Sequence, residues 1–176
     1  MRVRIVGSIE GKIRSHGIPG KKTGKCGENQ SAAVVFIDAR VIARVRAGAA
    51  ASFLEQKETM GLLTGHPFYD GGELKLEIDD SVPLPVNADA HHVSVDRQAA
   101  ELDCGQTFGE SLVIGWYHSH TGQGNFLSET DRRTHDAWFD QKYAVAMVIE
   151  ASENTISLYS KRDGALTAVQ YKVFEE

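Results

Sequence analysis

The sequence predicts an α/β fold in which a mixed β-sheet is flanked by about three helices. Segments with the two-residue alternation of strands are mixed with segments of helical periodicity, and they follow no strict βαβ repeat. The chain has 176 residues, of which 41% are hydrophobic and 24% charged, an ordinary composition for a globular protein. A chain of this length can bury one good core.

The N-terminal region differs in character from the rest of the chain. Arg2–Ile13 alternates enough to predict one or two short strands. His16–Gln30 is rich in glycine, lysine and polar residues, which predicts a mobile loop. We therefore divide the chain into N-terminal strands with a mobile basic loop, residues 1–30, and a catalytic domain over residues 31–176.

The first half of this domain is expected to contain a strand, a helix, a strand pair and a second helix. Asp38 is a suitable N-cap for a helix that continues to about Gln56, with Ile42, Val45 and Phe53 facing the core. The expected elements are a strand at Val34–Ile37, strands at Met60–Thr64 and Glu73–Leu84 joined by a turn over His66–Gly72, and a helix at Asp96–Cys104.

The second half is expected to complete the sheet around one more helix. Asn154 and Asp163-Gly164 provide the turn residues between the last strands. The expected elements are a strand at Leu112–His118, a helix at Asp131–Gln141, and strands at Tyr143–Glu150, Thr155–Lys161 and Ala165–Phe174.

Charge and composition exclude several classes of partner. Residues 1–46 hold ten basic and three acidic residues, a balance of +7, whereas residues 47–176 hold nine and twenty-one, a balance of −12. The basic residues are spread among glycines and β-type residues, so a solvated loop is favoured over a nucleic-acid site. No apolar run reaches about 18 residues and no signal peptide is recognisable, so we expect a cytoplasmic protein without a membrane partner. Two cysteines, Cys26 and Cys104, are too few for a disulfide framework.

The strongest functional signal is His118-Ser119-His120, followed by Ser128 and Asp131. Side chains two apart on a strand point to the same face, so the two imidazoles can converge on one ion. Asp131 would return from the first turn of the following helix. Two histidines and a carboxylate suit Zn²⁺, and three protein ligands leave one coordination position open, as in catalytic zinc sites.

These residues also have a structural interpretation. Ser128 and Asp131 fit an N-cap and its capping-box partner at the start of a helix. Capping and metal binding are compatible, because the cap would itself orient Asp131. His66 is expected in a turn and His135 one helical turn after Asp131, and a surface position is favoured for both over a hydrogen bond to a metal ligand.

The spacing of His118, His120, Ser128 and Asp131 resembles the signature of the JAMM (MPN+) metalloprotease family. A glutamate before a Met-Gly-Leu-Leu-x-Gly strand is the upstream part of that signature, and the chain reads Glu58-Thr-Met-Gly-Leu-Leu-Thr-Gly. The loop after His120 is most similar to the proteasome-lid deubiquitinase and signalosome deneddylase branch. The resemblance covers about residues 34–150 and implies the cytidine-deaminase-like MPN fold.

Two departures mark the chain as a divergent member, and we expect a prokaryotic, archaeal homologue. The family usually has proline where this chain has Thr121, and its eukaryotic members usually have cysteine near Asn125. Neither position is a metal ligand or an acid/base group. The resemblance implies one catalytic zinc ion held by His118, His120 and Asp131.

The resemblance also assigns the two catalytic roles. Glu58 would accept a proton from water and pass it to the departing amine, and Ser128 would hydrogen-bond the oxyanion. On chemistry alone Glu55, one turn earlier, could compete with Glu58, which could also be a solvated residue at the helix end. The position relative to Met60 and Gly61 favours Glu58.

Three functions follow from the resemblance. The first is a zinc isopeptidase that removes ubiquitin or a ubiquitin-like modifier from conjugates, or trims its precursor after Gly-Gly, with proteasome association as a further expectation. The second is a peptidase acting on a sulfur-carrier protein, and the third is a metal-free MPN scaffold, disfavoured because all five signature residues are present. Val93-Ser94-Val95 alternates like an edge strand, where the deubiquitinase branch receives the substrate tail; ordinary edge structure is an equal alternative.

Overall fold

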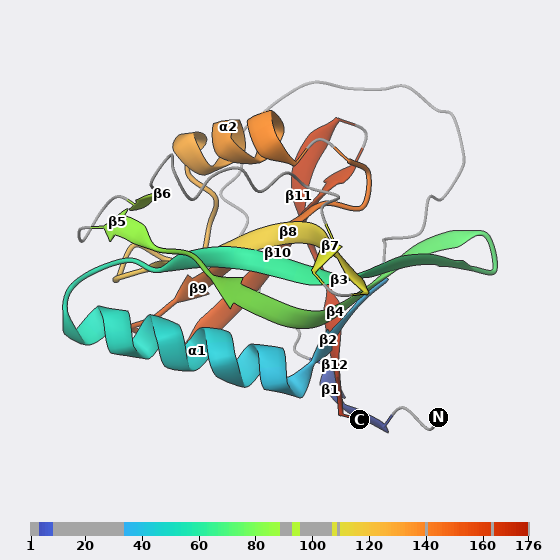
Figure 1. Ribbon diagram of the computed structural model, residues 1–176, viewed down its shortest axis with the longest axis horizontal. Coiled ribbons are helices and arrows are strands. Elements are labelled where there is room, and N and C mark those ends of the chain that lie inside the picture. Colours follow the sequence, from blue (N-terminus) through green and yellow to red (C-terminus); the bar gives the residue numbers. More distant parts are fainter. Residues whose placement is uncertain are drawn as a thin grey trace, which may run out of the picture.

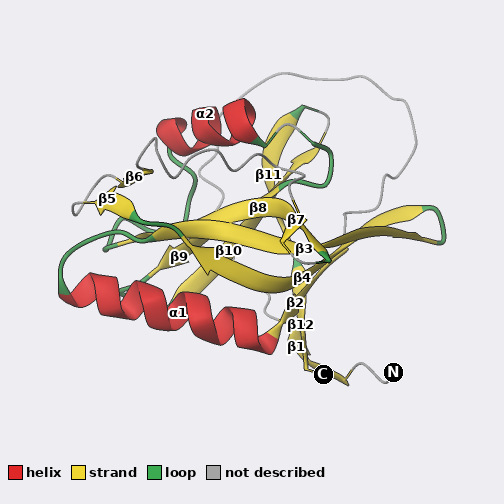
Figure 2. Cartoon of the chain, viewed as in Figure 1, coloured by secondary structure: helices red, strands yellow, loops and turns green. Residues whose placement is uncertain are grey.

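A large mixed sheet lies between two helices in the computed structural model (Figures 1 and 2). The structure describes residues 4–8, 34–88, 93–95, 107–108, 110–139, 141–162 and 164–175. The predicted mixed α/β fold is confirmed. The division at residue 30, the predicted helix at Asp96–Cys104 and both cysteines lie outside the described residues. Neither described helix is long and apolar enough to cross a membrane.

The two described helices are α1 (Ala39–Leu54) and α2 (Glu129–Trp138). The strands are β1 (Arg4–Ser8), β2 (Val34–Asp38), β3 (Met60–Asp70), β4 (Glu73–Pro83), β5 (Val86–Ala88), β6 (Val93–Val95), β7 (Thr107–Phe108), β8 (Ser111–His120), β9 (Val145–Glu150), β10 (Thr155–Arg162), β11 (Ala165–Val169) and β12 (Tyr171–Glu175).

The large sheet has the strand order β1-β12-β2-β4-β3-β8-β9-β10-β11, with β7 paired to β8. The pairs β12·β2, β2·β4 and β8·β9 are parallel and the others antiparallel. Only Gln170 separates β11 from β12, although they lie near opposite edges of this order. Strands are spaced about 4.8 Å apart, so a flat sheet would hold these two roughly 30 Å apart. The sheet must therefore curl until its edges approach each other.

The central strands are buried on both faces. In β9, Val145, Met147 and Ile149 belong to the core that α1 covers, whereas Ala146 and Val148 belong to a second core on the opposite face. The second core includes residues at both ends of α2, and Figure 1 shows α1 and α2 on opposite sides of the sheet. Strands buried on both faces read as continuous apolar runs, which is the pattern of this segment.

The strand pair β3–β4 is longer than the sequence predicts. The turn expected over His66–Gly72 is wrong: β3 continues to Asp70, and only Gly71 and Gly72, both with positive φ, form the turn. Pro67 disfavours an interior strand because it lacks an N–H donor. Here β3 pairs with β8 only as far as Gly65, so among the described strands Pro67 is paired on one side alone.

Two other boundaries also differ from the prediction. The single strand expected over Ala165–Phe174 is two strands, because Gln170 lies where the chain passes from the β10 edge to the β1 edge of the sheet. The helix expected over Asp131–Gln141 begins at Glu129 and ends at Trp138. Asp38 caps α1 as predicted, accepting a hydrogen bond from the Arg40 backbone N–H at 2.7 Å.

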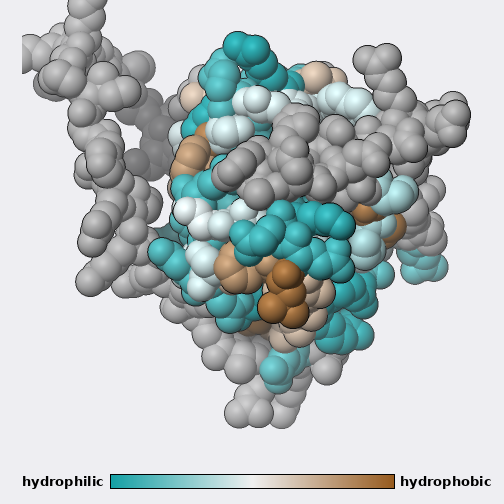
Figure 3. Space-filling model, turned by 90° about the vertical axis from the view of Figure 1, so that its left-hand side faces the viewer, coloured by the Kyte–Doolittle hydropathy of each residue, from teal (hydrophilic) through white to brown (hydrophobic). Residues whose placement is uncertain are grey.

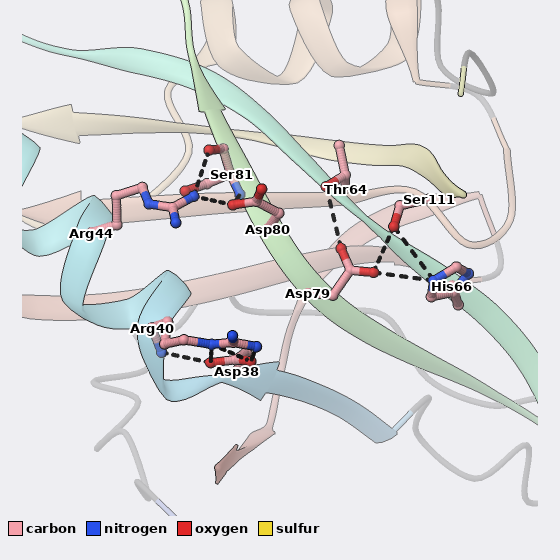
Figure 4. Close-up of polar contacts among 9 residues, drawn as sticks. All are labelled: Asp38, Arg40, Arg44, Thr64, His66, Asp79, Asp80, Ser81 and Ser111. Carbon is pink, nitrogen blue, oxygen red and sulfur yellow. Dashed lines mark hydrogen bonds and ion pairs between the residues drawn. The ribbon is translucent and has the colours of Figure 1, made fainter. Parts of the chain in front are cut away.

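Polar contacts fasten α1 and β4 to their neighbours (Figure 4). Arg44 of α1 pairs with Asp80 and donates to the Ser81 carbonyl of β4. A serine, a histidine and an aspartate also meet, at the start of β8: Ser111 Oγ donates to Asp79 Oδ2 at 2.7 Å, and His66 Nε2 lies 3.1 Å from the same oxygen. Ser111 Oγ also lies 3.4 Å from His66 Nε2, so the three side chains contact one another, and the shorter contact of the serine is with the carboxylate.

Candidate metal centre

Three side chains from two elements converge where β8 ends. His118 and His120 are two residues apart on β8 and extend the face of Trp116, which lies in the second core. Their Nε2 atoms are 3.0 Å apart. Asp131 of α2 places Oδ2 3.4 Å from His118 Nε2 and 4.0 Å from His120 Nε2. Alternation along the strand thus aims both imidazoles at the helix that covers this face.

The protonation of these groups suits a cation. Burial lowers the pKa of His120, which favours its neutral, ligating form. Burial by itself raises the pKa of the Asp131 carboxyl, but hydrogen bonds from His118 and Ser128 outweigh it and set the pKa at about 2. The three candidate ligand atoms lie within 4.8 Å of one another. Two nitrogens and a carboxylate oxygen are a donor set that fits Zn²⁺.

A capping box at the start of α2 holds Asp131 in place. The Asp131 backbone N–H donates to Ser128 Oγ at 3.2 Å, and the Ser128 N–H donates to Asp131 Oδ2 at 2.7 Å. The oxygen that faces the histidines is therefore the one fixed by the Ser128 backbone. The capping interpretation and the metal interpretation describe the same geometry, because the cap orients the carboxylate.

Glu58 lies beside this cluster because of the β3–β8 register. Met60 opposes His118, and Ser119 N–H donates to the Thr59 carbonyl at 2.9 Å. Extending that register by two residues sets Glu58 opposite His120. The Glu58 side chain is buried and accepts a hydrogen bond from Gln123 Nε2 at 3.2 Å. The competing Glu55 is exposed and pairs with Lys57.

Three aromatic rings behind the ligands were not anticipated as part of the site. Trp116 stacks on His118 with ring centroids 4.8 Å apart, and its Nε1 donates to His135 Nδ1 at 3.2 Å. Phe139 stacks on both Trp116 and His135. The predicted surface position of His135 is therefore wrong, whereas His66 is exposed as expected, although it lies in β3 and not in a turn. Asp131, His135 and Phe139 follow each other at four-residue spacing, a signal that could have revealed this shared helix face.

A buried carboxylate, Glu150, was also not predicted to belong to the site. It ends β9 and directly opposes His120 across the parallel β8–β9 pair. Burial raises the pKa of the Glu150 carboxyl, but hydrogen bonds from Ser152, Gly124 and Gly122 outweigh this and lower it overall. Glu150 is therefore a charged group buried next to the candidate ligands.

The structure places the predicted substrate-binding residues Val93, Ser94 and Val95 in β6. This strand pairs antiparallel with β5, and the two form a small separate sheet. β5 follows Leu84, whose N–H donates to the Met60 carbonyl at 3.0 Å, so the small sheet begins near the start of β3. Figure 3 faces this end of the molecule, where the described surface is mostly hydrophilic with a compact apolar group. Phe126, half exposed, makes an edge-to-face contact with the ring of His120.

Comparisons with known proteins agree on one family. Residues 30–142 match the family model described as JAB1/Mov34/MPN/PAD-1 ubiquitin protease. The chain is 34% identical over 91 residues, 51% of its length, to NAD(+) hydrolase TcpA of Theionarchaea archaeon (strain DG-70-1). It is 36% identical over 99 residues, 53% of its length, to ubiquitin carboxyl-terminal hydrolase RPN11 of Saccharomyces cerevisiae. It is 35% identical over 82 residues, 44% of its length, to COP9 signalosome complex subunit 5 of Kluyveromyces lactis.

The matched regions are a minor part of these relatives, at 26%, 31% and 21% of the three chains respectively. Among solved structures, the solution structure of protein DSY2949 from Desulfitobacterium hafniense superposes with a TM-score of 0.57. That match covers 81% of this chain and 94% of the other at 16% identity, so it speaks for the fold alone.

Proposed function

The chain belongs to the JAB1/Mov34/MPN/PAD-1 ubiquitin protease family, and from this premise we propose that it is a zinc-dependent peptidase. Its substrate would be ubiquitin or a ubiquitin-like protein, released from lysine conjugates or trimmed from a precursor after Gly-Gly. The observation that carries the proposal is the convergence of His118, His120 and Asp131 beside the buried Glu58. The NAD chemistry in the archaeal relative's name is not part of the proposal, because the family model that residues 30–142 match is described as a ubiquitin protease.

His118, His120 and Asp131 would hold the ion. When bound, zinc supplies Lewis-acid activation of water and of the scissile carbonyl. The stack of Trp116 on His118 and the capping box at Asp131 fix two of the ligands from behind. Trp116 lies in the buried second core and Asp131 is partly buried, so the ligand side chains lose little further conformational freedom when the ion binds.

Glu58 would move the proton. Its carboxylate would accept a proton from the attacking water and deliver it to the departing amine, which leaves as a neutral lysine or backbone amine. The Gln123 amide donates to Glu58 Oε1, and a donor of this kind favours the ionised carboxylate that can accept the proton. Because Gln123 lies in the loop after β8, the arrangement of that loop bears on the acid/base group as well as on the ligands.

Ser128 would stabilise the negative charge that develops on the substrate carbonyl oxygen. Its Oγ accepts the Asp131 N–H through a lone pair, and its hydroxyl hydrogen, which can face the Asp131 carboxylate, would turn to the substrate oxygen. The Asp131 N–H occupies a lone pair of the hydroxyl and so does not compete with that donation. A preorganised donor of this kind acts more strongly on the transition state than on the substrate.

The substrate tail would add as an extended strand along β6, at Val93, Ser94 and Val95. Among the described residues β6 pairs with β5 on one side only, and a peptide can add to a strand edge through main-chain hydrogen bonds. The net charge of −12 over residues 47–176 would favour a substrate tail that is basic before its Gly-Gly. The cytoplasm as its compartment and association with a proteasome are further parts of this proposal.

The test is cleavage by the zinc-loaded protein with and without chelator. Three substrates separate the alternatives: a ubiquitin-like precursor extended beyond Gly-Gly, a lysine-linked conjugate, and a sulfur-carrier protein extended at its C-terminus. We expect cleavage after Gly-Gly that the chelator abolishes and added zinc restores. Cleavage of the sulfur carrier alone would favour the second function. No chelator-sensitive cleavage of any substrate would contradict the proposal and favour a scaffold.

A further inference from the structure

We propose that Glu150 is a positioning residue of the metal centre: it holds the loop after β8 so that the Gly124 carbonyl sets the orientation and tautomer of His120. This inference rests on the proposed function, because it concerns the same centre. Glu150 belongs to none of the signature positions and lies thirty residues after His120 in the chain. It reaches the site because β8 and β9 are parallel neighbours that end side by side.

The two carboxylate oxygens of Glu150 have different partners. Oε1 accepts hydrogen bonds from the backbone N–H of Ser152 at 3.0 Å and from its hydroxyl at 2.7 Å, both in the turn that follows β9. Oε2 accepts a hydrogen bond from the Gly124 N–H at 2.6 Å, across the strand boundary in the loop after β8. Oε1 therefore holds the turn after β9, and Oε2 holds the loop after β8 against that turn.

Gly124 is held from both sides. Its N–H is bound by Glu150, and its carbonyl oxygen accepts a hydrogen bond from His120 Nδ1. The residue has φ 90°, a conformation that favours glycine because it has no Cβ. If the Glu150 contact were lost, rotation of this segment would move the carbonyl away from the imidazole.

The carbonyl determines which nitrogen of His120 carries the proton. A carbonyl oxygen can only accept, so Nδ1 must be the donor, and in the neutral imidazole Nε2 is then unprotonated. Nε2 is the atom that faces His118 and Asp131. Glu150 thus acts on the ligand through one glycine, and metal-ligating histidines are commonly oriented by a partner of this kind at the other nitrogen.

Substitution of Glu150 by glutamine tests this role. Glu150→Gln keeps the shape of the side chain, but its amide nitrogen must face either the Gly124 N–H or the Ser152 donors. We expect the affinity for zinc, measured by competition with a chromophoric chelator, to fall by about 10- to 100-fold. In the metal-free protein, the ¹⁵N shifts of the His120 ring should change from one tautomer protonated at Nδ1 to a mixture.

Two controls separate positioning from a general loss of structure. Ser152→Ala removes the hydroxyl contact with Oε1 and leaves Oε2 on Gly124, so zinc affinity and the His120 tautomer should not change. Glu153→Gln removes the same charge from an exposed neighbour and should also leave both unchanged. Circular dichroism and thermal unfolding report whether each variant is folded.

Unchanged zinc affinity together with an unchanged tautomer in folded Glu150→Gln would overturn the proposal. If that variant does not fold, Glu150→Asp keeps the charge and shortens the reach toward Gly124, and the same two readouts apply with the same outcomes. A wild-type protein that binds zinc but cleaves nothing would contradict the proposed function alone. The tautomer of the metal-free protein would still test the role of Glu150.

Discussion

Glu55 and Glu58 have the same chemistry and lie three residues apart, yet the fold buries one and exposes the other. Glu55 follows the end of α1 and pairs with Lys57 in solvent. Glu58 precedes β3, whose register with β8 brings it to the ligands. The proposed difference in role therefore depends on the burial and position of each carboxylate and not on its chemistry.

Glu58→Gln should retain zinc and lose turnover. The amide has nearly the same shape but cannot accept the water proton, so we expect kcat to fall by about 100- to 10,000-fold. Zinc content by mass spectrometry and cleavage of a precursor substrate are the two measurements. Glu55→Gln is the matched control and should retain wild-type kcat. A Glu58→Gln protein with full activity would refute the assignment of this residue.

The stability of helix α2 and the proposed chemistry depend on the same residue, because Ser128 is both the N-cap of the helix and the proposed oxyanion donor. The first turn also carries Glu129 and Asp131, whose negative charges suit a helix N-terminus. A helix start of this kind can be recognised from sequence, since cap and partner are three residues apart.

Ser128→Ala should therefore show two separate effects. Loss of the cap should lower the free energy of unfolding by about 1 kcal/mol. Loss of the hydroxyl donor should lower kcat by about 100- to 1,000-fold. Denaturant unfolding and steady-state kinetics measure the two. Ser128→Thr keeps both functions of the hydroxyl and is the control. If Ser128→Ala lost stability but kept kcat, the hydroxyl would serve the helix only.

The short strand β6 would make a different kind of contribution, through its backbone, under the proposed function. Val93→Pro removes one N–H and should raise KM by about 3- to 10-fold if that group binds the substrate tail, with kcat little changed. Val93→Thr keeps the N–H and should leave KM near the wild-type value. Steady-state kinetics on a precursor substrate measures both. An unchanged KM in Val93→Pro would argue that β6 is ordinary edge structure.

At the scale of the whole molecule, the curled sheet places the candidate metal centre between β8 and α2, beside the buried second core. One consequence is the neutral, fully buried His135, which accepts a hydrogen bond from Trp116. Burial lowers the pKa of His135 to about 4; the nearby Asp136 raises this pKa and Lys161 lowers it, both by smaller amounts. The unfolded chain would titrate the same residue near its ordinary value of about 6.5.

The free energy of unfolding should therefore fall as the pH falls through this window. Between about pH 6.5 and pH 4 the unfolded state binds a proton at His135 that the folded state does not. The stability that comes from neutral His135 is therefore fully present above pH 6.5 and is lost on acidification toward pH 4. Its full size is on the order of 3 kcal/mol. Denaturant unfolding with chelator present, so that zinc release does not contribute, measures it.

The control for this pH dependence is His135→Gln, which can accept the Trp116 N–H but does not titrate. The difference between wild type and variant should grow as the pH rises from 4 to 6.5, because only the wild type gains this contribution. If the free energies of unfolding of the two proteins changed in parallel with pH, His135 would not be the source of the pH dependence.

Local patterns determined much of the molecule. Alternation in β8 sets His118 and His120 on one face, and Asp38 and Ser128 cap the two described helices, although the second was expected to begin only at Asp131. These signals depend on residues within one turn or one strand, so they are visible in the sequence. The extension of β3 past Pro67 is not such a signal, because it depends on which neighbours β3 has on each side.

Contacts between distant segments were decided by the tertiary structure alone. Glu58 and Gln123, Glu150 and Gly124, and His135 and Trp116 meet because of the strand order and the face that α2 covers. The periodicity of the sequence does not predict these contacts, since each depends on how whole strands and helices pack. The sequence by itself thus determined the family and the candidate ligands. Only the packing of the curled sheet decided which carboxylates and histidines are buried around them.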